Sequence, residues 1–395
     1  MIKLMKDTFY KEKETKEALC EFITNANILS LNEKCKEFEE EFSKYQGRKY
    51  SVLFNSGSSA NLSLIQSLLN LKLISKGDNV GFTALTWATN VMPLVQLGLN
   101  PIPIDVSLEN LNTNLKQLQD VPEELKCLFI TNILGFCGDL DKIKEYCDKN
   151  NIILIEDNCE SLGSKLNGKK LGNFSLGSTF SFFVGHHLST IEGGMVCTDN
   201  LELYNMLLMV RSHGWDRNLD KETQLVLKNK HNVEDFYRAY TFYYPGYNLR
   251  PTEITGFIGL EQLKYLEEVN QKRNNNFSKY MEATKDNLDI LLLKLNHMDF
   301  ISNFAYPMVF KDKETFEKYK SRFSDVEIRP IIGGSMTKQP FLSSNHSCPN
   351  AEQIHKFGFY IPNNPYLTKE EINFLTNLIK GKPEPRVIIK NWELL

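Results

Sequence analysis

Short apolar segments alternate with amphipathic segments through the middle of the chain. The apolar segments have the length of buried strands, and the segments between them repeat apolar positions at helical spacing. The predicted strands cover residues 50–54, 79–82, 101–106, 126–131, 151–157 and 178–183, and the predicted helices cover residues 61–71, 88–98 and 139–150. Strands that alternate with helices in this way indicate a mostly parallel sheet with helices on both faces.

The pattern differs at both ends of the chain. Residues 1–45 are polar and predict helices, and residues 253–288 predict one long helix that bridges two lobes. Further strands are predicted at 303–310 and 326–331, and further helices at 315–323 and 368–381. We therefore predict a large α/β domain over residues 1–252 and a bridging helix with a small α+β domain over residues 253–395.

Composition and charge exclude several classes of protein. The chain has 395 residues, of which 42% are hydrophobic and 24% charged, and its net charge is 46 − 49 = −3. This balance offers no basic excess for nucleic acid, and no apolar run approaches the length of a membrane span. Eight cysteines without a CxxC pair favour reduced thiols over disulfides or a metal site. We expect a cytoplasmic protein that binds neither nucleic acid nor membrane.

Three segments carry candidate chemistry, and each also has a structural interpretation. The sequence NSGSSAN at 55–61 fits either an anion-binding helix N-terminus or a serine N-cap. Asp157 ends a predicted strand, where it can cap a helix or face a ligand at the carboxyl edge of the sheet. His186 and His187 follow another strand, where adjacent histidines fit packing better than metal ligation.

Several motifs, in this order, resemble the DegT/DnrJ/EryC1/StrS family of sugar aminotransferases. They are KCKEFEEEFSKYQGRKYSVLFNSGSSAN, FTALTWATNVMPLVQLGLNPIPIDV, LIEDNCESLGS and FSFFVGHHLSTIEGGMV. The resemblance implies a fold type I pyridoxal-phosphate (PLP) enzyme, similar to aspartate aminotransferase. In that α/β fold a mostly parallel sheet forms a large domain and an α+β domain follows it.

One position departs from the transaminases of this family. His186 stands where they carry the lysine that binds PLP covalently, and this substitution resembles the branch of sugar 3-dehydratases. An imidazole cannot hold the cofactor covalently, but its ordinary pKa near 6.5 suits a group that accepts and returns protons. The resemblance therefore implies that His186 is the catalytic residue.

The other site residues are assigned by the same resemblance. Asp157 is expected to pair with the pyridinium nitrogen, and Trp87 is expected to stack on the cofactor ring. The residues expected to hold the cofactor phosphate are Gly57, Ser58, Ser59 and Ser181, joined by Asn248 from the neighbouring subunit. This last contact implies a homodimer with shared active sites. Glu160 matches a position that contacts ring substituents, and the candidate substrate contacts are His213, Arg217, Arg250 and Arg329.

The implied reaction is removal of the C3 hydroxyl from a nucleotide-linked 4-keto-6-deoxy sugar, a GDP-linked hexose or heptose. Glutamate, as co-substrate, converts PLP to pyridoxamine phosphate (PMP), and ammonia is released. The product is a 3,6-dideoxy sugar of the kind used for lipopolysaccharide or capsule. One relative uses an iron–sulfur cluster and a separate reductase instead. We expect neither here, because no cysteine lies between Cys197 and Cys348, where the cluster ligands would fall.

Two alternatives remain open from the sequence. The chain could be a 4-aminotransferase that uses a displaced lysine, and Lys165, Lys169 and Lys170 are candidates on a predicted surface hairpin. It could also bind the cofactor or a sugar nucleotide without catalysis.

Cys159, beside the candidate aspartate, is expected to be a buried packing residue.

Overall fold

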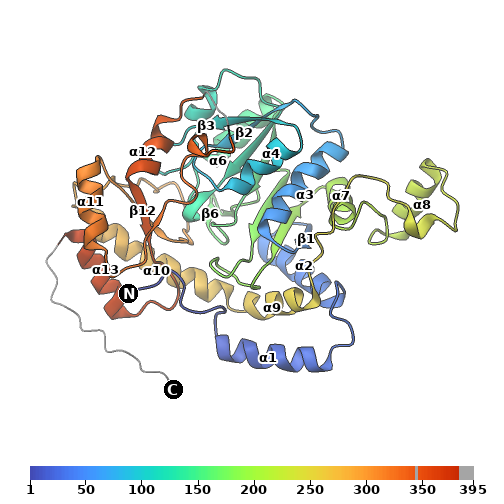
Figure 1. Cartoon of the computed structure of the whole chain (residues 1–395), viewed down its shortest axis with the longest axis horizontal. Helices are drawn as coiled ribbons and strands as arrows, with labels where there is room; N and C mark the ends of the chain where they lie inside the picture. The colour runs from blue at the N-terminus through green and yellow to red at the C-terminus, as the bar shows by residue number, and fades with distance from the viewer. Residues whose placement is uncertain (343–345, 382–395) are drawn as a thin grey trace.

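A seven-stranded sheet forms the centre of the molecule (Figure 1), which is described by a computed structural model over residues 1–342 and 346–381. The strands lie in the order β1 (Tyr50–Phe54), β9 (Gly194–Thr198), β8 (Gly177–Ser181), β5 (Ile153–Asp157), β4 (Cys127–Thr131), β2 (Asn79–Thr83) and β3 (Asn100–Ile104). Strands β8, β5, β4, β2 and β3 pair in parallel, and β9 runs antiparallel to both β1 and β8. The predicted mostly parallel sheet is therefore confirmed, whereas β9 was not foreseen.

Helices cover both faces of this sheet. Alternate residues of one strand enter different cores: Phe129 packs with one set of helices, and Leu128 and Ile130 pack with another. The helices on the first face include α3 (Gly57–Asn70), α4 (Met92–Gln96) and α7 (Leu201–Arg211), and those on the second include α5 (Leu115–Gln119) and α6 (Leu140–Lys149). The predicted helix at 88–98 is a 3₁₀ turn, Ala88–Asn90, followed by the short α4.

The predicted long helix after residue 252 is two helices. Helix α9 (Glu253–Leu263) ends before a tight turn, in which Tyr265 N–H donates to the Gln262 carbonyl at 3.1 Å, and α10 (Leu266–Thr284) follows. No glycine or proline marks this break, so the residue pattern carried no signal for it. The N-terminal helices α1 (Glu12–Asn25) and α2 (Glu33–Gln46) pack against α9.

A second, three-stranded sheet lies in the C-terminal part of the chain. Its order is β10 (Tyr306–Val309), β12 (Gly358–Ile361) and β11 (Arg329–Pro330), with all pairs antiparallel, and the helices here are α11 (Lys313–Arg322), α12 (Pro349–Phe357) and α13 (Lys369–Lys380). The predicted strand at 326–331 is shorter than expected, because Val326 pairs with Ile2 from the chain start instead. The division of the chain after residue 252 stays a prediction.

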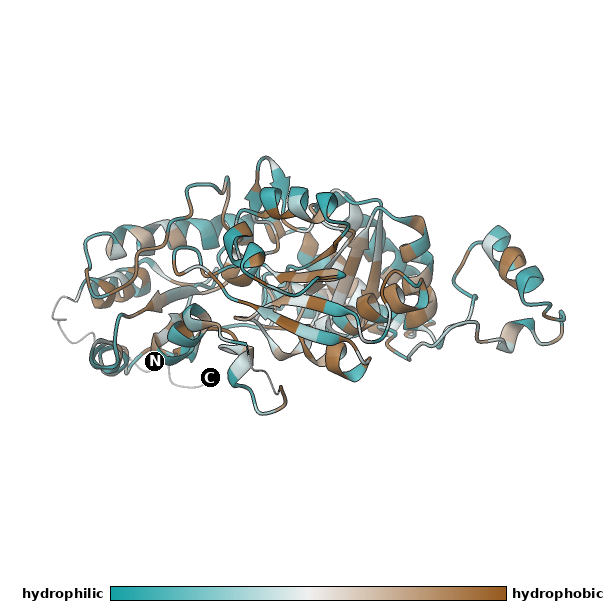
Figure 2. Cartoon of the chain, turned by 90° about the horizontal axis from the view of Figure 1, so that it is seen from above, coloured by the Kyte–Doolittle hydropathy of each residue, from teal (hydrophilic) through white to brown (hydrophobic). Residues whose placement is uncertain are grey.

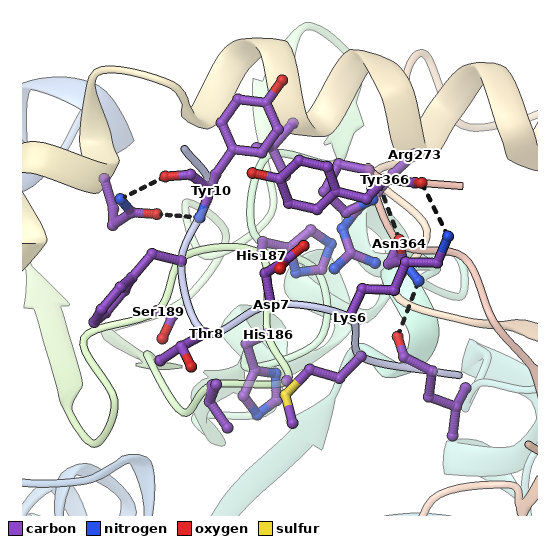
Figure 3. A pocket seen from close by; sticks show the side chains of 18 residues that line it. Lys6, Asp7, Thr8, Tyr10, His186, His187, Ser189, Arg273, Asn364 and Tyr366 are labelled. Carbon is purple, nitrogen blue, oxygen red and sulfur yellow. Dashed lines mark hydrogen bonds between the residues drawn. The ribbon is translucent and has the colours of Figure 1, made fainter. Parts of the chain in front are cut away.

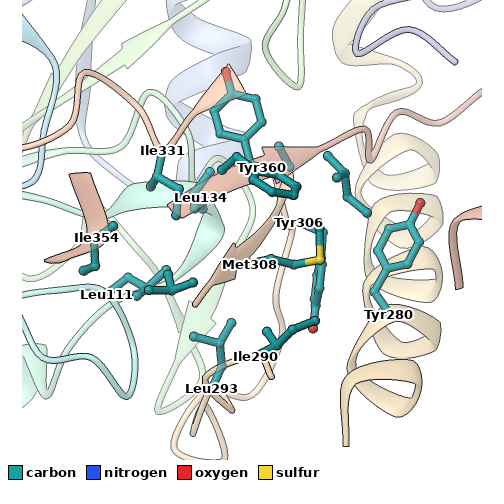
Figure 4. Close-up of a cluster of buried hydrophobic side chains, with 14 of the residues drawn as sticks. Leu111, Leu134, Tyr280, Ile290, Leu293, Tyr306, Met308, Ile331, Ile354 and Tyr360 are labelled. Carbon is teal, nitrogen blue, oxygen red and sulfur yellow. The ribbon is translucent and has the colours of Figure 1, made fainter. Parts of the chain in front are cut away.

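One hydrophobic cluster joins the two sheets (Figure 4). Met308 and Tyr306 of the small sheet share it with Leu111 and Leu134, which lie in loops of the large sheet, and with Tyr280 of α10. Burial of these side chains stabilises a fixed arrangement of the two parts, at roughly 1.5–3 kcal/mol for each large apolar side chain. Residues of both parts line one cavity, so this arrangement sets its geometry.

An arm that contains α8 (Lys221–Lys230) projects from the body (Figures 1 and 2). It exposes large aromatic side chains, with Phe236 84% and Tyr240 74% exposed. Exposed apolar patches of this kind are typical of interaction surfaces.

Within the described ranges, the chain has no helix that is both long and apolar enough to cross a membrane.

Candidate active site

A cavity of about 450 Å³ opens where the two sheets meet. Residues from the large sheet line it, including Asp157 and His186, and Phe304, Arg329 and Tyr360 come from the C-terminal part. Ligands of open α/β folds bind at this position, outside the carboxyl ends of parallel strands and between domains.

The N-terminus of α3 forms one wall of this cavity. Ser56 caps the helix by accepting from Ser59 N–H at 3.1 Å, and the Ser59 hydroxyl donates to Asn55 at 2.5 Å. Gly57 lies so close to strand β8 that an added Cβ would stand 2.6 Å from the Cβ of Ser181. Free backbone N–H groups and two serine hydroxyls therefore converge on a space that suits a phosphate.

Replacing Gly57 with alanine is expected to weaken PLP binding by about tenfold or more, which corresponds to 1.4 kcal/mol. The added methyl must displace Ser181 and so opens the cradle. Titration of the protein with PLP, followed by absorbance, measures this effect. Ser67→Ala, a buried change further along α3, is the control. Unchanged PLP affinity in Gly57→Ala would refute the phosphate assignment.

Asp157 is buried at the end of β5, and three donors hold its carboxylate. Oδ2 accepts from Asn61 Nδ2 at 2.9 Å and from Asn90 Nδ2 at 2.7 Å, and Oδ1 accepts from Cys159 N–H at 2.9 Å. Hydrogen bonds of this kind fix the direction of a carboxylate. The arrangement presents a fixed negative charge to the cavity.

His186 lies on the loop between β8 and β9 and reaches the same cavity. The backbone N–H of His186 donates to the Phe183 carbonyl at 2.9 Å, and the centre of its ring lies 5.3 Å from that of the Phe304 ring. Burial and the positive charge of Arg273 lower the pKa of His186 to about 4, partly offset by the Cys159 backbone. The imidazole is therefore neutral at pH 7 and able to accept a proton.

His187 does not share this position. It is buried, its Nε2 lies 2.8 Å from the Ser302 carbonyl, and it does not line the cavity. Burial lowers its pKa well below the ordinary value. The side chain thus anchors the loop against the C-terminal part, as a structural neighbour of His186.

Two residues beside Asp157 also face the cavity. Burial raises the pKa of Glu160 to about 8, and its Oε2 accepts from Leu134 N–H at 2.9 Å. Glu160 is therefore mainly protonated at pH 7 and can donate a hydrogen bond. Cys159, expected to be a buried packing residue, is only half-buried and lines the cavity. Burial raises the pKa of its thiol, which keeps it protonated.

These residues fit a phosphorylated aromatic ring with a basic nitrogen. The cradle at Gly57 suits the phosphate, and the Asp157 carboxylate suits a protonated ring nitrogen. Trp87 lines the cavity and leaves 56% of its surface exposed, so an aromatic face is available for stacking. The described residues include no group of three or more histidine, cysteine or acidic side chains placed to hold a metal.

The structure brings together most of the site residues expected from the sequence. The cavity is lined by Gly57, Ser58, Trp87, Asp157, Ser181, His186 and Arg329, and Ser59 lies directly beside it. Asn248, Arg217 and Arg250 line a separate cavity of about 460 Å³, and His213 packs on the Trp215 ring next to it. The Arg217 guanidinium stacks 3.8 Å from the centre of that ring. Within one chain these four residues stay outside the active-site cavity.

The lysines considered as a displaced cofactor anchor are not in the active-site cavity. Lys165 and Lys170 belong to a hairpin of β6 (Lys165–Leu166) and β7 (Lys169–Lys170), and its turn has positive φ at Asn167 and Gly168. Lys170 Nζ donates to the Tyr45 carbonyl and lies over the Tyr45 ring. None of the described residues that line the cavity is a lysine.

Sequence reasoning missed several residues of the site. Asn61 and Asn90, which hold Asp157, are buried amides. A polar residue inside a buried helix was the available signal for Asn61. Phe304 and Tyr360 lie more than a hundred residues from His186, so only the tertiary fold brings them to the cavity.

Comparison with known proteins defines the class to which this site belongs. Residues 10–380 match the DegT/DnrJ/EryC1/StrS aminotransferase family, and the chain belongs to that family. Its fold is therefore the PLP-dependent aminotransferase fold, which the sequence resemblance implied.

Two related proteins and one solved structure are similar to this chain over most of its length. The chain is 34% identical to GDP-4-keto-6-deoxy-D-mannose 3-dehydratase of Yersinia pseudotuberculosis, over 91% of this chain and 93% of that protein. It is 33% identical to the enzyme of the same name from Escherichia coli O55:H7, over 91% and 95%. The crystal structure of GDP-4-keto-6-deoxymannose-3-dehydratase with a trapped PLP–glutamate geminal diamine superposes with a TM-score of 0.88, at 31% identity over 96% of this chain and 100% of that one.

Proposed function

We propose that this protein is a PLP- and PMP-dependent 3-dehydratase of a GDP-linked 4-keto-6-deoxy sugar. The observation that carries the proposal is the position of His186 in a cavity that otherwise suits PLP and that no lysine lines within the described chain. The relatives named for this reaction support the choice of substrate and of glutamate as co-substrate. The product serves the synthesis of 3,6-dideoxy sugars for lipopolysaccharide or capsule.

The chain offers a binding group for each part of the cofactor. Gly57, Ser58, Ser59 and Ser181 would hold the phosphate, Asp157 would pair with the ring nitrogen, and Trp87 would stack on the ring. When bound, PLP draws electrons from the bonds next to the substrate nitrogen and so weakens them. Because no lysine among the described residues lines the cavity, these noncovalent contacts would retain the cofactor.

His186 moves the protons that both halves of the reaction need. Its neutral imidazole accepts the proton from Cα of glutamate and returns it, and in the second half it accepts a proton while the C3 hydroxyl leaves as water. Glu160, protonated on the same wall, is placed to donate to the substrate. The balance is one 4-keto sugar plus glutamate giving one 3-deoxy-4-keto sugar, 2-oxoglutarate and ammonia. Glutamate supplies both electrons, so no separate reductase enters the proposal.

The deciding experiment incubates the protein with PLP, glutamate and GDP-4-keto-6-deoxymannose. We expect equal amounts of ammonia and 2-oxoglutarate, and a sugar that has lost the C3 oxygen by mass spectrometry. An amino sugar that keeps its C3 hydroxyl would instead establish a 4-aminotransferase. Absence of 2-oxoglutarate with PLP bound would establish a protein that binds the cofactor without catalysis.

We further propose that the enzyme is a homodimer in which each chain completes the partner's active site. Asn248, Arg217 and Arg250 gather in the second cavity, apart from the active-site cavity. Asparagine and arginine side chains suit phosphate and diphosphate groups, and in their own chain these residues lie outside the cavity that His186 lines. The eight cysteines are free thiols, in keeping with action in the cytoplasm.

Mixing two inactive variants tests the shared site. His186→Asn and Asn248→Ala chains are each expected to have little activity alone. After subunit exchange, about a quarter of the wild-type activity is expected to return, since half of the dimers are mixed and each carries one intact site. Mixing two batches of the same variant is the control. Complete lack of recovery, with mixed dimers verified by mass spectrometry, would show that Asn248 acts within its own chain.

A further inference from the structure

Ile332 adopts a backbone conformation that isoleucine rarely takes. Its φ is 52°, in the left-handed region, which the branched Cβ of isoleucine makes unfavourable. Among the described non-glycine residues with positive φ, only Ile332 and Ile191 are β-branched. Ile332 lines the active-site cavity, whereas Ile191 does not. Strain of this kind persists where the surrounding structure enforces it, and it is concentrated at sites that bind ligands.

The contacts around Ile332 enforce this conformation. The residue stands at the first central position of a tight turn over residues 331–334, which a backbone hydrogen bond of 2.9 Å closes. The turn packs closely on the large sheet: an added Cβ at Gly333 would stand 2.8 Å from the Thr86 carbonyl oxygen and 3.5 Å from the Trp87 ring. Ile332 also packs partly against the hydrophobic cluster of Figure 4. The turn thus fixes the isoleucine in the wall of the active-site cavity.

The space open to substrate lies on one side of His186. On the other side, residues 4–10 and Tyr366 pack near the loop that carries it (Figure 3) and leave a space of about 50 Å³. A nucleotide sugar does not fit there, since pockets for small molecules usually hold about 300 Å³ or more. The substrate therefore occupies the active-site cavity of about 450 Å³, which the C-terminal part of the chain closes on one side.

The wall that the C-terminal part contributes is mostly apolar. Its residues are Phe304, Arg329, Pro330, Ile332 and Tyr360. The carbonyls that flank Ile332 in the chain already accept hydrogen bonds, one from Gly334 N–H and the other from Gln339 Nε2 at 2.9 Å. A hydroxyl group placed against the isoleucine side chain would lose its hydrogen bonds to water, whereas a methyl group there would gain from burial.

The proposed sugar substrate has one substituent that suits such a surface. A 4-keto-6-deoxy sugar nucleotide carries hydroxyl groups, a carbonyl and a diphosphate, and the C6 methyl is the apolar substituent of its sugar ring. Glutamate enters the same cavity in the proposed reaction, but it carries two carboxylates and no methyl group, and charged groups do not suit an apolar side chain. The surface at Ile332 therefore fits the sugar better than the amino acid.

We propose that Ile332 contacts the C6 methyl group of the sugar and makes the enzyme select 6-deoxy sugars over sugars with a C6 hydroxyl. A turn position with positive φ usually carries glycine or asparagine, and an isoleucine kept there at the cost of strain supplies an apolar contact that neither residue offers. This inference rests on the proposed function, because it concerns the sugar that this function assigns. It makes Ile332 a residue for specificity, with no part in the glutamate half-reaction.

Two unreactive sugar nucleotides that differ by one oxygen atom test this contact. GDP-6-deoxymannose carries the C6 methyl group, GDP-mannose carries a hydroxymethyl group, and neither has the 4-keto group. Isothermal titration of the PMP-loaded enzyme measures the dissociation constant of each. We expect the wild type to bind GDP-6-deoxymannose about tenfold more tightly than GDP-mannose. In Ile332→Asn the ratio of the two constants is expected to fall to about one, because a polar side chain then faces C6.

Asparagine suits this test because it tolerates the left-handed conformation. The melting temperature of the cofactor-free Ile332→Asn variant is expected to stay near the wild-type value, since relief of strain offsets the lost apolar packing. Ile191→Asn is the matched control: it makes the same change at the other strained isoleucine, outside the cavity, and is expected to keep the tenfold ratio. Ile332→Leu keeps an apolar side chain and is expected to retain the preference for the methyl group.

The possible results separate this inference from the proposed function. A ratio near one in Ile332→Asn, with the tenfold ratio kept in Ile191→Asn, supports the contact. Equal binding of the two nucleotides by the wild type, or an equal loss of affinity for both in Ile332→Asn, overturns it and leaves the 3-dehydratase assignment standing. The KM for glutamate is expected to be unchanged in Ile332→Asn, and a large rise would also overturn the inference. Lack of binding of either nucleotide by the wild type would refute the GDP-linked substrate itself, and this inference with it.

Discussion

Replacing His186 with asparagine is expected to lower both 2-oxoglutarate formation and ammonia release by about 10²–10⁴-fold, the usual contribution of general acid–base catalysis. Asparagine keeps a polar side chain of similar reach but cannot take up a proton at neutral pH. The residues that hold the cofactor are separate from His186, so PLP affinity is expected to stay near the wild-type value. Stopped-flow absorbance of the PLP–glutamate reaction and titration with PLP measure the two quantities separately.

The pH dependence of the wild type provides a control for this variant. Burial and Arg273 lower the pKa of His186 to about 4, so the imidazole stays neutral and competent well below its ordinary value of 6.5. The rate of the glutamate half-reaction is therefore expected to hold down to about pH 5 and to fall as the pH approaches 4. His186→Asn is expected to lose this acid limb along with the rate. A variant that kept both would exclude His186 as the base.

Much of the fold followed from residue patterns because local chemistry determines it. Strand β4 is apolar at its first four positions, so a buried strand was the consistent interpretation of its sequence, and all five of its residues are buried. The break between α9 and α10 and the short β11 were missed for a different reason. The short β11 depends on a distant residue, because Val326 pairs with Ile2, and no local pattern encodes that contact. The break between α9 and α10 carries no glycine or proline that would have marked it.

The residues of the active site likewise fall into two groups, those that the sequence predicted and those that depend on contacts between distant residues. Gly57, Asp157 and His186 lie in contiguous motifs, and the family resemblance that these motifs carry implied one shared site, where the structure places all three. The amides that hold Asp157 and the aromatic residues of the small sheet depend on side-chain packing. Asn248 and the arginines near it line a separate cavity in a single chain, so the role proposed for them in a partner's site stays a prediction.

Asp157→Asn is the second substitution with a large expected effect. It removes the negative charge that faces the ring nitrogen, and the new amide would also place a donor against Asn61 and Asn90, which both donate to Oδ2. Loss of one such preorganised electrostatic contact costs about 10²–10³-fold in rate. We therefore expect 2-oxoglutarate formation to fall by that factor, with a smaller loss in PLP affinity because the phosphate contacts remain.

The neighbouring carboxylate on the same strand provides a matched control. Glu156 is also buried, but it accepts from the N–H groups of Gly172 and Phe174 and does not line the active-site cavity. Glu156→Gln therefore removes a buried charge without changing the charge that faces the cofactor, and we expect it to lower the melting temperature more than the rate per folded molecule. A shift in the absorbance of bound PLP only in Asp157→Asn would identify the ring nitrogen as the partner of Asp157. Equal losses of rate in both variants would mean that Asp157 acts only through stability, and that the cofactor orientation proposed for this cavity is wrong.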